Sequence, residues 1–350
     1  MSIGFVMLNA TGSQFYYFLR ILNLGLFKIS SFNIIDFMKA ERNKTIDLSV
    51  EEGAEYLKQC IHVSENADLN SIIDKTIHGD TFEVLKKLPN QFVDLLIVDP
   101  PYNLNKDFHG NKFKQTSDEF YAEYTRSWIE LCKPLLKPNA SVYVCCDWIS
   151  SCIIGLELKK HFKIQNRITW QREKGRGAKS NWKNGMEDIW FCTLSDDYTF
   201  NVEDVKIRRR VVAPYKKGGE PKDWEETEEG NFRNTYPSNF WDDISIPYWS
   251  MAENTAHPTQ KSEKLLAKLI LASSNKGDVV FDPFLGSGST SVTAKKLERH
   301  FCGIEQNEQY CVWIQKRLEM AETDKSIQGY TDGVFWERNT SSIQKTKTKK

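Results

Sequence analysis

Residues 92–102 read FVDLLIVDPPY. Apart from Asp94, residues 92–98 are apolar, which is typical of a parallel strand that is buried on both faces. Asp99 and two prolines come directly after this run. In open α/β sheets, ligands bind beyond the carboxyl ends of the parallel strands. The stretch therefore predicts a central strand and, at its end, a ligand-binding corner.

Strands and helices are expected to alternate on both sides of this strand. Ser49 followed by Glu52 predicts a capped helix over 47–60, and Asp80 followed by Glu83 predicts a second capped helix. Further helices are expected over 117–137, 148–161, 262–274, 289–298 and 307–322, and further strands over 76–80, 141–146, 167–170, 187–192, 279–282 and 300–305. This alternation predicts an α/β fold with a doubly wound, mostly parallel sheet.

The alternation stops between about 195 and 256. That stretch is polar and rich in Trp, Tyr and Pro, so we expect an inserted module or a set of loops there rather than sheet. From about 323 the chain is polar and ends in KTKTKK, which predicts a solvated tail. Near the start, an apolar segment over 15–37 is interrupted by Arg20 and Lys28, so neither a membrane span nor a signal peptide is expected.

The composition excludes some classes of protein. Among 350 residues, 47 Lys and Arg balance 47 Asp and Glu, so the formal net charge is zero. This balance gives no global reason to expect nucleic acid, although a local basic patch can supply phosphate contacts. Eight cysteines form no CxxC pair, so neither a zinc site nor a disulfide framework is expected. Reduced, buried thiols fit a cytoplasmic protein.

The corner after the central strand is rich in hydrogen-bond acceptors. Two prolines stiffen the turn and remove two backbone donors, which leaves the Asp99 carboxylate, the Pro100 carbonyl and the aromatic face of Tyr102. Such a corner suits a planar molecule with an amino group, because the group can donate two hydrogens while its ring stacks on the tyrosine. A rigid turn carrying a surface tyrosine is the alternative.

A glycine-rich turn follows another expected strand, in FDPFLGSGSTSVTA over 281–294. Gly286 and Gly288 permit a tight turn and a close approach of a ligand to the backbone. Glu305 ends the next expected strand, where a carboxylate commonly accepts ribose hydroxyls. Position 291 is Ser, so the dinucleotide fingerprint GxGxxG is not met and NAD is disfavoured. A nucleoside without phosphates fits better, and a structural turn is the alternative.

Together, DPPY over 99–102 and FLGSG over 284–288 resemble the DNA amino-methyltransferases. The tetrad precedes the glycine loop, and HPTQK over 257–261 lies between them, which is similar to the β class of that family. The family has a proline after that lysine, whereas this chain has Ser262. The resemblance spans about 77–320. It implies the S-adenosylmethionine-dependent methyltransferase fold with an inserted target-recognition region.

The resemblance also implies a domain organisation. We expect an N-terminal extension, partly helical, over 1–75, the catalytic half over 76–194 and the target-recognition insertion over 195–256. The cofactor-binding half is expected over 257–322 and the Lys-rich tail over 323–350.

Family roles carry over to matching positions. The tetrad would hold the target amino group, with catalytic residues Asp99, Pro100, Pro101 and Tyr102. S-adenosylmethionine would be held by Asp80 at its adenine, Glu305 at its ribose, and Asp282, Phe284, Gly286, Gly288 and Thr290 around its methionine part, with His257, Thr259 and Lys261 closing the site. Phe108 and Trp170 are candidate walls of the pocket for the target base.

The implied reaction is methylation of the adenine N6 amino group in DNA. Two acceptors outside the base plane, Asp99 and the Pro100 carbonyl, would localise the nitrogen lone pair for direct attack on the methyl group. The base would first flip out of the duplex. Asp rather than Ser at position 99 favours adenine over cytosine by family resemblance. Methylation of cytosine, of RNA or of protein, and an inactive nucleic-acid-binding subunit, remain alternatives.

Two basic clusters are candidates for contacts with DNA phosphates and base edges. They cover 172–183 and 206–217, and the residues are Arg172, Lys174, Arg176, Lys179, Lys183, Arg208, Arg209 and Arg210. The acidic run over 223–230 would have to face away from the duplex. A solvated surface is the alternative for each cluster. Double-stranded DNA is the expected partner, with a cognate restriction endonuclease and a homodimer as further expectations, in the cytoplasm of a prokaryote or from a phage.

Overall fold

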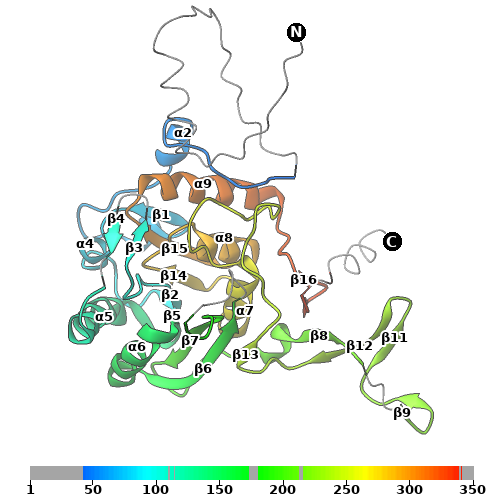
Figure 1. The fold of residues 1–350 in the computed structure, drawn as a ribbon. Helices are drawn as coiled ribbons and strands as arrows, with labels where there is room; N and C mark the ends of the chain where they lie inside the picture. Colours follow the sequence, from blue (N-terminus) through cyan, green and yellow to red (C-terminus); the bar gives the residue numbers. More distant parts are fainter. Residues whose placement is uncertain are drawn as a thin grey trace, which may run out of the picture. The chain divides into compact units, whose positions relative to one another are not determined.

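The structure is a computed structural model that describes residues 42–108, 111–113, 115–172, 180–212, 216–338 and 340. Its centre is an eight-stranded sheet in the order β1-β15-β14-β2-β5-β7-β6-β13 (Figure 1). The strands are β1 Lys75–His78, β15 His300–Glu305, β14 Val279–Asp282, β2 Val93–Val98, β5 Leu136–Asp147, β7 Met186–Thr193, β6 Lys163–Gln171 and β13 Phe240–Trp241. The first five run parallel to one another, and β7 is antiparallel to both β5 and β6. The predicted α/β fold with a mostly parallel sheet is confirmed.

Helices cover both faces of this sheet (Figure 1). The two core clusters show the two layers: one contains buried residues of α4, α5 and α6, and the other contains buried residues of α7, α8 and α9. The bounds are α4 Thr81–Leu85, α5 Asp118–Cys132, α6 Trp148–His161, α7 Glu263–Ser273, α8 Ser289–Lys296 and α9 Glu308–Thr323. Strand β2 is buried on both faces except at Asp94, as its apolar sequence predicted.

Caps fix where the helices begin. The side chains of Ser117, Asp147, Ser262 and Asn307 each accept a hydrogen bond from a backbone N–H in the first turn of α5, α6, α7 and α9. Near the N-terminal end of the described chain, Ser49 and Glu52 form the predicted reciprocal capping box. The helix that follows is only α2 Ala54–Leu57, shorter than the predicted 47–60, because Ile61 already pairs with β1. Another short helix, α3 Leu69–Ile72, precedes β1.

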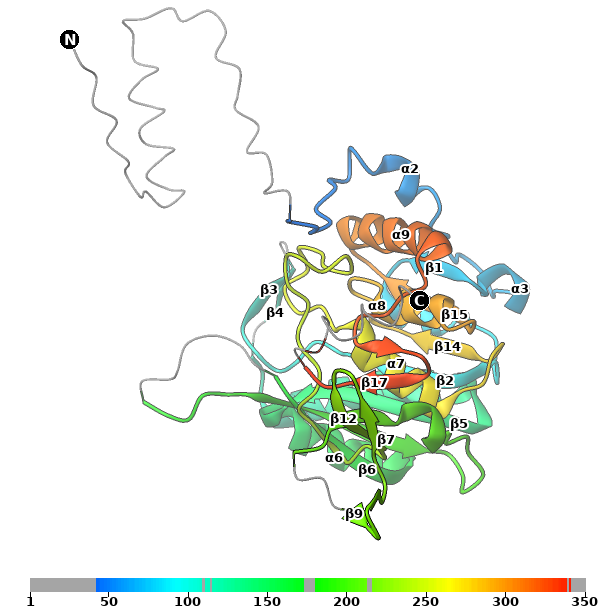
Figure 2. The same cartoon turned by 90° about the vertical axis from the view of Figure 1, so that its right-hand side faces the viewer.

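The stretch over 195–256 differs from the prediction of loops, because it contains several strands. A second sheet has five strands in the order β11-β12-β8-β17-β16; it lies to one side of the main sheet in Figure 1 and faces the viewer in Figure 2. Its bounds are β8 Ile207–Arg210, β11 Glu225–Thr227, β12 Gly230–Thr235, β16 Tyr330–Thr331 and β17 Val334–Trp336. Strands β9 Lys216–Lys217 and β10 Glu220–Pro221 form a small hairpin within this stretch. Another small hairpin, of β3 Lys106–Phe108 and β4 Asn111–Phe113, lies outside it, after the tetrad. Within its described residues, the insertion therefore combines short strands with loops and one 3-10 helix, Val202–Val205.

The prediction of a solvated tail from 323 onward is wrong for residues 330–336. Strand β17 pairs with β8, and Phe335 and Trp336 are fully buried. The sequence is polar around them, so these two aromatic residues were the available sign in the sequence that this part of the chain is buried. The Lys-rich end and the apolar segment over 15–37 lie outside the described residues. Within the described part of the chain, no helix is long and apolar enough to cross a membrane.

Candidate active site

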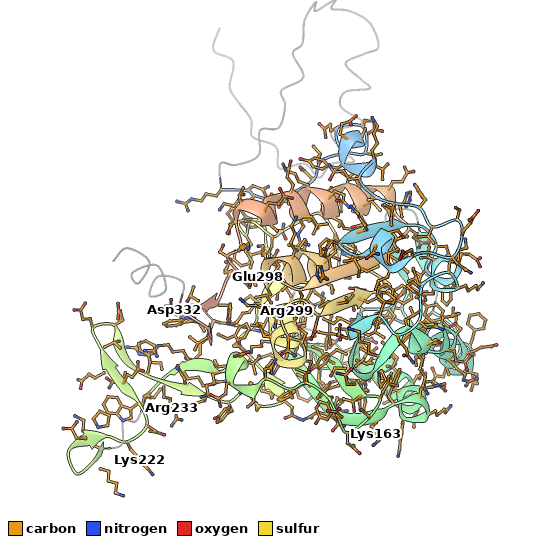
Figure 3. The ribbon with its side chains drawn as sticks, turned by 180° about the vertical axis from the view of Figure 1, so that it is seen from behind. Lys163, Lys222, Arg233, Glu298, Arg299 and Asp332 are labelled. Carbon is orange, nitrogen blue, oxygen red and sulfur yellow. The ribbon has the colours of Figure 1, made fainter. Side chains whose placement is uncertain are left out.

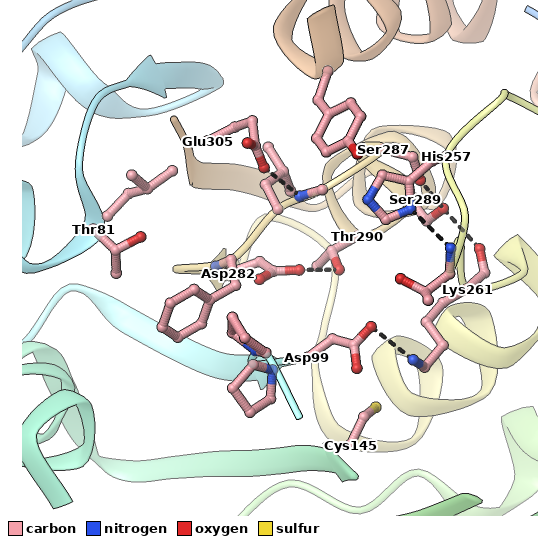
Figure 4. A pocket seen from close by; sticks show the side chains of 18 of the residues that line it. Thr81, Asp99, Cys145, His257, Lys261, Asp282, Ser287, Ser289, Thr290 and Glu305 are labelled. Carbon is pink, nitrogen blue, oxygen red and sulfur yellow. Dashed lines mark hydrogen bonds and ion pairs between the residues drawn. The ribbon is translucent and has the colours of Figure 1, made fainter. Parts of the chain in front are cut away.

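A cavity of about 330 Å³ opens where β2, β14 and β15 end. These strands are neighbours in the sheet, so the segments that follow them meet although they lie far apart in the sequence. Figure 4 shows Asp99, Asp282 and Glu305 facing this space. The cavity size falls within the usual range of small-molecule sites.

The Asp99 carboxylate accepts two short hydrogen bonds. The hydroxyl of Tyr102 donates to Oδ1 at 2.6 Å, and the ammonium of Lys261 donates to Oδ2 at 2.6 Å (Figure 4). The same ammonium lies 3.0 Å from the Tyr102 hydroxyl. Burial raises the pKa of Tyr102 well above its usual range, so this phenol stays protonated and donates. The three side chains form one hydrogen-bonded group in the wall of the cavity.

The backbone of the tetrad is anchored by side chains that the sequence analysis missed. The hydroxyl of Tyr121 donates to the Pro101 carbonyl at 3.0 Å. Asn103, which is 4% exposed, accepts from the Thr116 backbone N–H at 2.8 Å and donates to the Thr116 carbonyl at 3.0 Å. Because both anchors lie beside a stiff Pro-Pro turn, the position of the Asp99 carboxylate is tightly constrained.

The glycine loop holds two residues in the left-handed region. Gly286 has φ 56°, and its N–H donates to Oε2 of Glu305 at 2.8 Å. A Cβ at this position would lie 3.2 Å from Nε2 of His257, inside the cavity wall. Gly288 has φ 79°, and a Cβ there would lie 2.8 Å from Cγ1 of Ile314. Gly286 therefore faces the ligand space, whereas Gly288 allows α8 to pack closely on α9.

Two buried carboxylates face the cavity from β14 and β15. Asp282 accepts from the Thr290 hydroxyl at 2.6 Å and from the Phe284 N–H at 3.0 Å. Glu305 accepts from the Asn307 N–H at 2.8 Å in addition to Gly286. Burial raises the pKa of each carboxylate to about 7. Perturbed carboxylates in a cavity are typical of ligand sites, since burial without a ligand is costly.

The segment before α7 closes one side of the cavity. His257 accepts from the Thr259 N–H at 3.3 Å, and its ring contacts Tyr310 edge-on at 4.5 Å. The Ser289 hydroxyl donates to the carbonyl of Lys261 at 2.7 Å, which links this segment to the start of α8. On the opposite side, Asp80 caps α4, and Phe82 lies against Tyr124 with ring centroids 5.8 Å apart. All of these residues line the cavity, and its aromatic side chains can enclose a flat ring.

The structure brings most of the sequence-predicted cofactor residues together. Asp80, His257, Thr259, Lys261, Asp282, Phe284, Gly286, Thr290 and Glu305 line the cavity, and so do the four tetrad residues. Gly288 is outside this lining and serves helix packing. Lys261 was predicted to close the cofactor site, whereas its ammonium points to Asp99. Trp170 is 1% exposed and donates to the Ile244 carbonyl at 3.0 Å, so it belongs to the core; the Phe108 side chain lies outside the described ones.

The two basic clusters divide into buried and exposed members. The prediction for Arg208 is wrong, because it is 5% exposed, pairs with Glu225 at 2.8 Å and lies over the rings of Phe232 and Trp336. Arg209 is partly exposed and pairs with Glu337 at 3.2 Å.

Arg210 and Lys183 are exposed, and Arg172 is half-buried against Glu187. Lys174, Arg176 and Lys179 lie outside the described residues. In the acidic run, Glu225 pairs with Arg208, and Asp223 pairs with Arg233, which is labelled in Figure 3. The negative charge of the run is therefore partly neutralised by arginines of the second sheet.

Comparison with known proteins identifies the family. A family model described as DNA methylase matches residues 93–316. The chain belongs to this DNA methylase family. The DNA adenine methyltransferase YhdJ of Escherichia coli (strain K12) is 34% identical over 252 residues, which cover 70% of this chain and 82% of the relative. The type II methyltransferase M.HpaI of Haemophilus parainfluenzae is 32% identical over 248 residues, covering 70% and 74%.

Solved structures agree on the fold of this DNA methylase. The cytosine-N4-specific PvuII DNA methyltransferase superposes with a TM-score of 0.52 at 16% identity, covering 71% of this chain and 90% of that one. At that identity the likeness concerns the fold alone. The matched range 93–316 contains the tetrad, the glycine loop and the segment before α7, and it excludes Asp80 and the paired strands β16 and β17.

Proposed function

We propose that this DNA methylase transfers a methyl group from S-adenosylmethionine to the N6 amino group of adenine in DNA. One observation carries the proposal: the acceptor-rich tetrad and the glycine loop with Glu305 line the same cavity. The relatives support it, since one is named a DNA adenine methyltransferase and the other a type II methyltransferase.

The cavity residues fit the donor. Glu305 offers a carboxylate to the two ribose hydroxyls, and the backbone at Gly286 leaves room for a ligand that a Cβ would fill. Phe82 and Tyr124 offer aromatic faces for a flat base. When bound, the donor supplies an electrophilic methyl group on a sulfonium.

The tetrad would act on the amino nitrogen of the target base. Asp99 and the Pro100 carbonyl accept its two hydrogens, which draws the nitrogen toward a tetrahedral geometry and localises its lone pair. Direct displacement at the methyl carbon then needs alignment rather than a covalent intermediate on the protein. The nitrogen loses one proton, and Asp99 is the acceptor placed to take it.

The target base would reach this cavity by flipping out of the duplex, because a stacked base lies too deep for the donor to reach. Exposed cations at Lys183 and Arg210 are our candidates for phosphate contacts. The type II relative leads us to propose a role in restriction and modification, with a cognate endonuclease that shares the site. A homodimer and action in the bacterial cytoplasm complete the proposal.

Transfer of tritiated methyl groups to unmethylated DNA, followed by nucleoside analysis, tests the function. We expect N6-methyladenine. N4-methylcytosine would instead place the chain with the cytosine enzymes, and absence of transfer under saturating donor would overturn the proposal.

A further inference from the structure

Lys261 lies between two carboxylates, only one of which belongs to the tetrad. Its ammonium nitrogen is 2.6 Å from Oδ2 of Asp99 and 3.4 Å from Oε2 of Glu187, which stands near the start of β7. The Lys261 and Glu187 side chains are 8% and 3% exposed. A small movement of the ammonium within this enclosed space would exchange one carboxylate for the other.

Glu187 is prepared to receive the ammonium. Its Oε1 accepts a hydrogen bond from Arg172, whereas its Oε2 is buried and has no hydrogen-bond partner among the described residues. A buried acceptor without a donor is destabilising, and more so when it is charged. Hydrogen bonding of Lys261 to Oε2 would remove this cost.

The position seen for Lys261 is unfavourable for the proposed reaction. Tyr102 and Lys261 each donate to one oxygen of Asp99, so the target amino group must donate to a carboxylate that already accepts from both. The amino nitrogen also gains positive charge as it attacks the methyl group, and a lysine ammonium close to it opposes that charge. Both difficulties disappear when Lys261 moves to Glu187.

We propose that Glu187 is a positioning residue that takes the Lys261 ammonium from Asp99 when the target base enters. The inference rests on the proposed methyl transfer to an amino group. Arg172 holds the far oxygen of Glu187, which keeps Oε2 directed to Lys261. Arg172 also begins the basic cluster over 172–183, so the same chain of ion pairs joins a candidate DNA-contacting segment to the tetrad.

A double-mutant cycle tests the inference. Glu187→Gln keeps the side-chain size and an acceptor for Arg172, but it cannot hold the ammonium charge. We expect kcat to fall by about tenfold or more, with the Kd for S-adenosylmethionine changed by less than about twofold. In a Lys261→Met background, Glu187→Gln should change kcat by less than about twofold, because no ammonium remains to be moved.

The neighbouring residue supplies a matched control. Asp188 is also a buried carboxylate of β7, and it accepts from the hydroxyls of Ser151 at 2.7 Å and Thr169 at 2.9 Å, away from the cavity. Asp188→Asn measures what neutralising a buried carboxylate on this strand does to the folded fraction. Its activity per folded molecule should equal that of the wild type. If Glu187→Gln does not fold, Glu187→Asp replaces it, since the shortened carboxylate should also lower kcat.

The outcomes separate the two proposals. An inactive wild type would overturn the proposed function. If the wild type is active, two results would overturn the role of Glu187 and leave the function standing. One is an unchanged kcat in Glu187→Gln, or in Glu187→Asp where the first variant does not fold. The other is that the effects of Glu187→Gln and Lys261→Met on kcat multiply in the double variant.

Discussion

The ammonium nitrogen of Lys261 lies 2.6 Å from Oδ2 of Asp99, although 162 positions separate the two residues in the chain. Lys261 stands in the segment before α7, and Asp99 directly follows β2. Both residues line the cavity, and their ion pair forms part of its wall.

Asp99→Ala should lower kcat by about 100-fold or more, because it removes one of two acceptors for the target amino group. Tritium transfer at saturating donor measures the loss. Asp94→Asn, at the opposite end of β2, is the control, since Asp94 pairs with Lys137 at 2.7 Å outside the cavity. Full activity in Asp99→Ala would exclude the proposed mechanism.

The two glycines of the loop should respond differently to alanine. Both glycines have a left-handed φ, so alanine costs some stability at either position. At Gly286 the added methyl group also enters the cavity wall beside His257, so the Kd for S-adenosylmethionine should rise by about tenfold. At Gly288 it meets Ile314, so the free energy of unfolding should fall by about 1–3 kcal/mol. Calorimetric titration and urea unfolding measure the two effects. Equal loss of donor affinity in both variants would contradict this division.

Glu305 should make the free protein less stable as pH rises. Its pKa is raised by burial from 4.5 to about 7, so between these values the folded state holds a proton that the unfolded state has lost. Stability contributed by the protonated form is present below about 4.5 and is lost as pH rises through about 7. A shift of this size corresponds to about 3 kcal/mol.

Glu305→Gln removes this titration. Urea unfolding at pH 5 and pH 8 should therefore show a smaller loss of stability in the variant than in the wild type, although Asp282 still contributes in the same direction. The same variant should bind S-adenosylmethionine more weakly at pH 8, because the ionised acceptor for the ribose is gone. An identical pH dependence of unfolding in both proteins would show that Glu305 does not titrate in this range.

Neighbouring arginines should separate DNA binding from stability. Arg210 is exposed, so Arg210→Gln should weaken DNA binding and reduce the slope of log K against log salt by about one. Arg208 is buried between two aromatic rings, so Arg208→Gln should cost about 1–3 kcal/mol of stability. Filter binding at several salt concentrations and thermal unfolding give the two readouts. If Arg208→Gln alone changed the salt slope, the assignment would be reversed.

Much of the fold could be predicted because its signals are local. The helix Trp148–His161 has the predicted bounds, and the apolar run of β2 gives a fully buried strand. Capping residues are equally local, and Ser262, where the family has a proline, caps α7 with its side chain. The strands of the second sheet could not be predicted this way, because β8 acquires its buried character only by pairing with β12 and β17.

By itself, the sequence determined the order of elements and the chemistry at each strand end, since burial pattern, caps and turns depend on residues a few positions apart. Only the tertiary structure decided which side chains meet. Arg208 and Arg210 stand in one basic run, yet Arg208 is buried under the rings of Phe232 and Trp336, whereas Arg210, the last residue of β8, is exposed. Glu187 carries no motif, and it reaches Lys261 because β7 lies in the same sheet as β2, next to β5. Such meetings depend on contacts between distant segments, which local sequence patterns do not encode.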